Sequence, residues 1–186
     1  MRIRFAAVVV LLLLVVPACP AAEIDWTKVR AEAVQLLQEL IRIDTTNPPG
    51  NERAAALYLQ KLLESDGIET RVLDVAPGRA NLYARLKGDG SGRPLILLSH
   101  LDVVMAEPQR WTVPPFSGEL RDGFIYGRGA TDMKGTATVQ TTVMRLLKRL
   151  NVPLKRDLIL LAVADEEAGG TGAMSIIEKH PDLIAG

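Results

Sequence analysis

The sequence predicts an α/β protein, a three-layer sandwich of helices around a mostly parallel central sheet. Segments with apolar residues at helical spacing alternate along the chain with short apolar segments. Two of the short segments, 95–99 and 157–164, are apolar runs of the kind found in strands buried on both faces. Helices that alternate with buried strands build layered α/β domains.

Composition excludes some classes of function. The chain has 186 residues, 48% of them hydrophobic and 24% charged, which is typical of a globular protein. Lys and Arg together number 22, as do Asp and Glu, so no basic surface for nucleic acid is predicted. Function must therefore come from local chemistry.

The first 22 residues are predicted to be a secretory signal peptide. Positive charge in residues 1–4 precedes an apolar run, 5–16, and then small residues and prolines up to Ala22. Cleavage after Ala22 would leave residues 23–186 as a secreted or periplasmic protein. An uncleaved N-terminal anchor is the alternative, although the apolar run is short for a membrane span.

The only cysteine, Cys19, lies inside this leader. Its surroundings loosely match a bacterial lipoprotein signal, so a membrane-anchored lipoprotein is a second alternative. The protein would meet a membrane only in these two cases. The folded part has no disulfide and no cysteine nucleophile.

Two helices are predicted in the chain before the first strand. Asp25 can cap a helix whose apolar residues continue at helical spacing to Ile41. The segment 47–50, Asn-Pro-Pro-Gly, breaks that helix. A second helix is expected from Glu52 to Ser65, ended by Gly67.

Strands follow at 69–75, 81–86 and 95–99, and Asp122-Gly123 predicts a hairpin between 118–120 and 124–126. The remaining elements are a helix over 133–150, a strand over 157–164 and a helix from about Gly172 to Lys179. His180, before Pro181, is interpreted as a helix terminator and not as a ligand.

Three polar clusters lie where strands or turns end. His100 and Asp102 follow the first apolar run, and Glu166 and Glu167 follow the second. Asp132 lies in a glycine-rich turn before a helix. In open α/β sheets, ligands bind beyond the carboxyl ends of the strands, and His with carboxylates is a ligand set for zinc. The sequence therefore predicts a metal site there.

Each cluster alone has a simpler interpretation. The His-x-Asp pair could be a surface turn, Asp132 could be a helix N-cap, and the Glu pair could be a solvated loop. Asp102 could instead accept the second ring proton of His100 and orient it as a ligand. Two adjacent carboxylates raise a proton affinity, which suits a general base.

Six motifs occur in one order along the chain. They are His100-Leu101-Asp102, Trp111 through Gly118, Asp122-Gly123, Tyr126 through Ala130, Asp132-Met133-Lys134-Gly135, and Asp165 through Gly170. This ordered set resembles the zinc metallopeptidase family of aminoacylase, carboxypeptidase S, acetylornithine deacetylase and succinyl-diaminopimelate desuccinylase. The resemblance runs from about Ile43 to the chain end and is nearest to the aminoacylase and carboxypeptidase S branch.

The resemblance implies a role for each residue. His100 would bind one Zn2+, Asp132 would bridge two, and Glu167 would bind the second, with Co2+ or Mn2+ able to replace zinc. Glu166 would be the general base, Asp102 would orient His100, and the Asp132–Met133 peptide would be cis. A water bridging the two ions would hydrolyse an amide or peptide bond next to a free carboxylate, in an N-acyl amino acid or small peptide.

The resemblance covers only the N-terminal part of such enzymes. Relatives supply a further carboxylate, a distal histidine and a lid domain that mediates dimerisation, and none of these occurs in the 186 residues. Residues 23–186 would thus be an incomplete catalytic domain, inactive alone and without a dimer interface. The alternatives are an interaction module without a complete metal site, and a biosynthetic deacetylase or desuccinylase, which export argues against.

Overall fold

The computed structural model describes residues 23–185. The predicted signal peptide, residues 1–22 with Cys19, lies outside the described residues. The elements in chain order are α1 (Trp26–Arg42), α2 (Glu52–Ser65), β1 (Glu69–Ala76), β2 (Arg79–Leu86), β3 (Leu95–His100), β4 (Glu119–Arg121), β5 (Phe124–Tyr126), α3 (Lys134–Arg149), β6 (Leu158–Val163) and α4 (Thr171–Lys179), with 3-10 turns at Pro108–Arg110 and Pro181–Leu183.

Four strands form one sheet in the order β1-β2-β6-β3. Strand β6 runs parallel to β3, but β1–β2 and β2–β6 are antiparallel. The α/β class is confirmed, whereas the expectation of a mostly parallel sheet is corrected for the described strands. The reason is local: a tight turn at Pro77 and Gly78 joins β1 to β2, and such a short connection can only produce an antiparallel pair.

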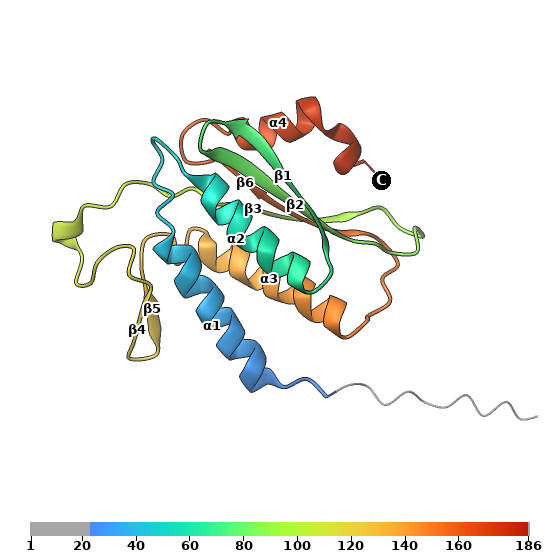
Figure 1. Cartoon of the computed structure of the whole chain (residues 1–186), viewed down its shortest axis with the longest axis horizontal. Coiled ribbons are helices and arrows are strands. Elements are labelled where there is room, and N and C mark those ends of the chain that lie inside the picture. Colours follow the sequence, from blue (N-terminus) through green and yellow to red (C-terminus); the bar gives the residue numbers. More distant parts are fainter. Residues whose placement is uncertain (1–22, 186) are drawn as a thin grey trace, which may run out of the picture.

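Helices cover both faces of this sheet, as the three-layer prediction requires (Figure 1). Because side chains alternate along a strand, Leu158, Leu160 and Ala162 of β6 join the core beneath α1, α2 and α3. On the other face, Leu161 and Val163 pack with Ile176 of α4. Strand β6 is buried along its whole length, which explains why its sequence is continuously apolar.

Strand β3 does not occupy the central position that its apolar sequence predicted. It pairs only with β6 among the described strands, so it is an edge strand. Leu98 is 53% exposed, and Leu95 and Ile96 are also exposed. Its sequence has the pattern of a strand that is buried on both faces, and the part of the protein that the structure describes covers only one side of it.

Local sequence signals account for the element boundaries. The Asp25 side chain accepts a hydrogen bond from the Lys28 amide at 3.0 Å and caps α1. Helix α2 has the predicted bounds. In the β4–β5 hairpin, Asp122 and Gly123 both have positive φ, 53° and 82°, as a type I′ turn requires. His180 is the C-cap of α4, as predicted.

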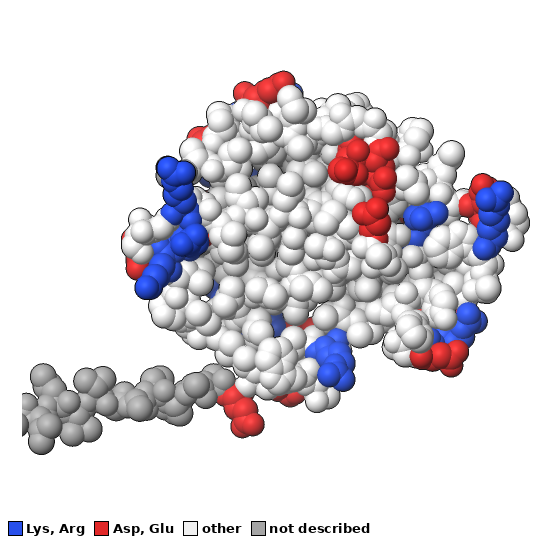
Figure 2. All heavy atoms as spheres, turned by 180° about the vertical axis from the view of Figure 1, so that it is seen from behind, with Lys and Arg blue, Asp and Glu red and all other residues white. Residues whose placement is uncertain are grey.

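Charged side chains are spread over the surface, and Figure 2 shows one compact group of acidic side chains on a face that is otherwise mostly uncharged. Within residues 23–185, the helices lack the combination of length and apolar character needed to cross a bilayer.

Candidate metal centre

The parallel pairing of β3 and β6 places the two main clusters at one edge of the sheet. His100, the last residue of β3, is in register with Val163, the last residue of β6. The chain after each strand therefore leaves the sheet at the same level. This geometry brings His100 and Asp102 next to Glu166 and Glu167, as the sequence predicted.

A third segment, residues 45–47, lies alongside the chain that follows β3. The Thr45 hydroxyl donates to the Leu101 carbonyl at 2.7 Å, and the Asn47 amide donates to the Val103 carbonyl at 2.9 Å. This pairing places the Asn47 side chain beside Asp102, to which its Nδ2 donates at 2.8 Å.

His100 has its two ring nitrogens in different surroundings. Nδ1 lies 3.0 Å from the Asp102 carbonyl oxygen and 3.5 Å from Asp102 Oδ1. Nε2 faces the site, 3.1 Å from Asp132 Oδ1 and 3.8 Å from Glu166 Oε2. Asp102 thus contacts the ring as predicted, with its backbone carbonyl nearer than its carboxylate. A neutral ring that keeps its proton on Nδ1 can offer Nε2 to a metal ion as a ligand.

The pKa values of this pair reflect their contact. Burial by itself lowers the pKa of His100, but the hydrogen bonds with Asp102 and Asp132 outweigh it and raise this pKa to about 9. Burial raises the pKa of Asp102, yet hydrogen bonds from His100, Asn47 and the amides of Glu166 and Glu167 lower it to about 2. Asp102 is therefore a stable anion that the surrounding donors hold in place.

Asp132 reaches the site from the turn before α3. Met133 is the N-cap residue of α3, so the interpretation of Asp132 as an N-cap is wrong. The Asp132–Met133 peptide is cis, as the resemblance implied. The next residue, Lys134, is fully buried, and its Nζ donates to the carbonyls of Leu40 at 2.9 Å and Ile43 at 2.8 Å. Lys134 ties this turn to the C-terminal end of α1.

The side chains present fit a divalent metal ion of the zinc type. Ligand atoms of His100, Glu166 and Glu167 all lie within 4.8 Å of one another. One imidazole nitrogen and two carboxylates are a ligand set that zinc accepts. The predicted ligand trio had Asp132 in place of Glu166. The structure brings all the predicted site residues together, with Glu166 in ligand reach and Asp132 beside His100.

The two glutamates are presented to solvent from one turn. The Glu166 side chain is 58% exposed, whereas Glu167 is less exposed. Burial, together with the nearby charges of Asp132, Asp102 and Glu166, raises the pKa of Glu167, although His100 opposes this effect. Crowded carboxylates of this kind are the surroundings in which a bound cation relieves repulsion.

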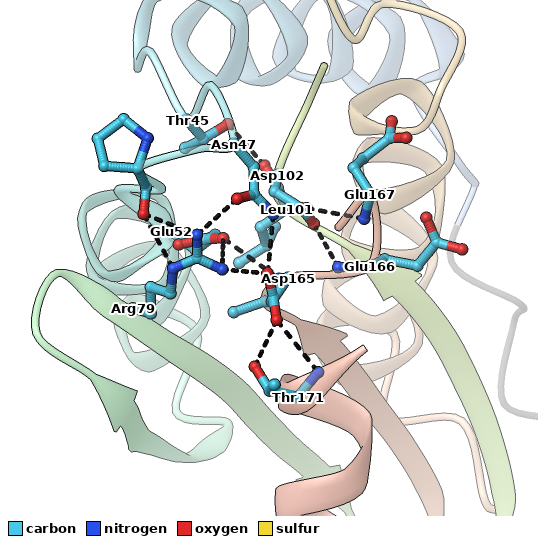
Figure 3. Close-up of polar contacts among 12 residues, drawn as sticks. Thr45, Asn47, Glu52, Arg79, Leu101, Asp102, Asp165, Glu166, Glu167 and Thr171 are labelled. Atoms are coloured by element: carbon cyan, nitrogen blue, oxygen red, sulfur yellow. Dashed lines mark hydrogen bonds and ion pairs between the residues drawn. The ribbon is translucent and has the colours of Figure 1, made fainter. Parts of the chain in front are cut away.

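A partly buried polar network behind the site was missed by sequence reasoning. It contains Asn47, Glu52, Arg79, Asp165 and Thr171, which the structure joins by hydrogen bonds and ion pairs (Figure 3). Asn47 was read only as a helix breaker and Glu52 only as a helix start. Nothing in the local sequence around Arg79 indicated a partner 86 residues away.

Comparison with known proteins shows what this chain is similar to in sequence and fold. Residues 96–186 match the family model described as Peptidase family M20/M25/M40. N-formyl-4-amino-5-aminomethyl-2-methylpyrimidine deformylase of Halalkalibacterium halodurans is 36% identical over 162 residues, 85% of this chain and 38% of that protein. A probable succinyl-diaminopimelate desuccinylase of Staphylococcus aureus is 38% identical over 150 residues, 80% of this chain and 36% of that protein.

Among solved structures, the M20 family metallo-carboxypeptidase Sso-CP2 from Sulfolobus solfataricus superposes with a TM-score of 0.72 at 27% identity. The match covers 82% of this chain and 35% of that one. The fold of the described residues thus resembles that of a class of metal-dependent hydrolases, and residues 96–186 match the M20 peptidase family. It spans less than two fifths of the length of the curated relatives named here.

Proposed function

We propose that the protein hydrolyses an amide or peptide bond in an N-acyl amino acid or small peptide, using two zinc ions. The observation that carries this proposal is the convergence of His100, Glu166 and Glu167 within 4.8 Å at one edge of the sheet. The names of the relatives, a deformylase, a desuccinylase and a carboxypeptidase, support hydrolysis as the reaction class.

Each residue has a distinct task in this proposal. His100 Nε2, Asp132 and Glu167 would hold the ions, and Asp102 fixes the orientation of the His100 ring. Glu166 takes a proton from the attacking water and passes it to the leaving nitrogen. Bound zinc supplies Lewis acidity and lowers the pKa of water, with Co2+ or Mn2+ able to replace it.

The finer statements on substrate and location are part of the same proposal. The substrate carries a free carboxylate, and the protein is exported by its leader and acts outside the cytoplasm. The two curated relatives bear names of the rival class, a desuccinylase and a deformylase. We retain the aminoacylase and carboxypeptidase S branch because of the segment from Trp111 to Gly118 and the predicted export.

For the 186-residue chain we propose metal binding with weak or absent turnover, because the resemblance requires one further protein ligand for each zinc. The test is a titration of the purified chain with Zn2+ in a calorimeter, followed by an assay with N-acetyl amino acids. Zinc binding without hydrolysis is expected. A chain that binds no zinc would favour an interaction module, and turnover at the rate of a complete enzyme would contradict the proposed inactivity.

A further inference from the structure

Arg79, at the start of β2, lies behind the candidate metal centre. Within residues 23–185 its hydrogen bonds and ion pairs reach none of the predicted metal ligands. We infer that Arg79 is a positioning residue: it fixes the turn that carries Glu166 and Glu167, and thereby sets the metal affinity of the site. This inference rests on the proposed function, because it assigns a task toward the same metal ions.

The guanidinium group of Arg79 joins three segments. Its Nε and Nη2 donate to the Pro49 carbonyl at 3.0 Å and 2.7 Å, and Nη2 also donates to the Asn47 side chain. Its Nη1 forms an ion pair with Asp165 and lies 3.8 Å from Glu52 Oε1. The Arg79 side chain is only 14% exposed. The planar group with five donors is suited to hold several acceptors in a fixed arrangement.

Asp165 is the residue on which the turn depends. It has φ of 64°, a left-handed conformation that is unusual for a residue other than glycine. Its carbonyl accepts from the amides of Gly169 and Gly170, and its Oδ2 accepts from the Thr171 hydroxyl at 2.6 Å. Its own amide donates to Glu52 Oε1 at 3.2 Å. The surrounding contacts therefore hold Asp165 in a conformation that redirects the chain after β6.

Asn47 connects this turn to the residue that orients His100. Its Nδ2 donates to Asp165 Oδ1 at 2.9 Å and to Asp102 Oδ2 at 2.8 Å. Asp102 in turn accepts from the amides of Glu166 at 3.0 Å and Glu167 at 2.9 Å. The network thus holds the backbone of the two glutamates by hydrogen bonds. Figure 3 shows that their side chains point away from the network.

The positive charge of Arg79 is a second reason to expect that this residue positions the turn. Glu52 is fully buried, Asp165 and Asp102 are buried, and Arg79 is the cation that pairs with the first two. Without it, Asp165 would be left beside Glu52 with no counter-charge in a site of low dielectric. Repulsion between the two carboxylates would then displace Asp165, and with it the turn that carries Glu166 and Glu167.

The experiment compares Arg79→Lys and Arg79→Met with Arg145→Lys and Arg145→Met. Arg145 is a matched control, because its side chain is 10% exposed and it pairs with Asp66 between α3 and α2. Zn2+ affinity would be measured by calorimetry, and amide exchange of Glu166 and Glu167 by NMR in the metal-free chain. Urea unfolding of each variant would confirm that it is folded.

We expect the Arg79 variants to bind Zn2+ about 10–100-fold more weakly than the wild type, as removal of partners that orient ligands does elsewhere. Their Glu166 and Glu167 amides should exchange faster. The Arg145 variants should lose stability to a similar degree without either change. If Arg79→Met does not fold, Arg79→Lys tests the inference alone. Lysine keeps the positive charge but lacks the planar set of N–H donors of the guanidinium group.

Two outcomes separate this inference from the proposed function. Unchanged zinc affinity and unchanged exchange in Arg79→Lys would overturn the role of Arg79 while leaving metal binding intact. A wild-type chain that binds no Zn2+ would overturn the proposed function, but faster exchange at Glu166 and Glu167 in Arg79→Lys would still support positioning of the turn by Arg79.

Discussion

The carboxylate of Asp102 accepts a hydrogen bond from the backbone amide of Glu167 at 2.9 Å, across a separation of 65 residues in the chain. A second bond, from the Glu166 amide, reaches the other oxygen of the same carboxylate. Asp102 therefore has two tasks: it contacts the His100 ring, and it holds the turn that carries the two glutamates.

Removal of Asp102 should cost both stability and metal affinity. We expect Asp102→Ala to lower the free energy of unfolding by about 2–4 kcal/mol, because it leaves several buried donors without an acceptor. Zn2+ affinity should fall about 10–100-fold. Urea denaturation and calorimetry would measure the two effects. Retention of wild-type affinity would show that Asp102 does not orient the site.

Substitutions that remove one carboxylate at a time distinguish the proposed general base, Glu166, from the proposed metal ligand, Asp132. Glu166→Gln should retain Zn2+ if Glu166 is the base, and turnover of any active form of the protein should fall about 10²–10⁴-fold. Asp132→Ala should lose metal. Metal analysis of both purified variants would check this. Equal loss of Zn2+ in the two variants would instead make Glu166 a ligand, an outcome that its reach to His100 and Glu167 allows.

Lys134 should contribute to stability through its two backbone acceptors. Lys134→Met fills a similar volume but leaves the carbonyls of Leu40 and Ile43 without their donor. We expect a loss of about 1–3 kcal/mol in urea denaturation. Lys148→Met, an exposed position near the end of the same helix, should change stability by less than about 0.5 kcal/mol. Equal effects would show that the buried bonds contribute nothing.

Asp66 should make stability depend on pH. Burial raises the pKa of Asp66, but hydrogen bonds from Arg149 and Arg145 outweigh it, so the folded-state pKa is lowered. A lowered pKa adds stability above the unfolded value of about 3.9, and that stability is lost as the pH falls through the folded value.

Asp66→Asn should therefore destabilise the protein at about pH 6, and the difference from wild type should shrink toward about pH 3. Denaturant unfolding at both pH values would measure it. Glu178→Gln, an exposed position on α4, is the control for charge removal and should change stability by less than about 0.5 kcal/mol at about pH 6. A difference that stays constant with pH would contradict the contribution of the Asp66 charge.

The exposed edge of β3 should promote self-association. Unpaired backbone groups and apolar side chains on an edge strand are a template for pairing with another chain. We expect Leu98→Lys to reduce association in sedimentation experiments over a range of concentrations. Ile177→Lys, an equally exposed apolar position on α4, should have less effect. If both substitutions act alike, general hydrophobicity and not the strand edge is responsible.

The sequence by itself determined the local elements and indicated the candidate site residues. Capping by Asp25, the turn chemistry of Asp122-Gly123 and the apolar runs act over a few residues, so their signals can be read along the chain. His100, Asp102, Asp132, Glu166 and Glu167 stood out for the same reason, since each follows a strand or lies in a glycine-rich turn.

Only the tertiary structure decided which strands are neighbours and what supports the site. An apolar strand sequence does not state its place in a sheet, so β3 was predicted at the centre and lies at the edge of the described sheet. Arg79 and Asp165 are 86 residues apart, and no periodicity links them. Pairings of this kind depend on how whole elements pack, because a buried charge is stable only where folding brings its partner to it.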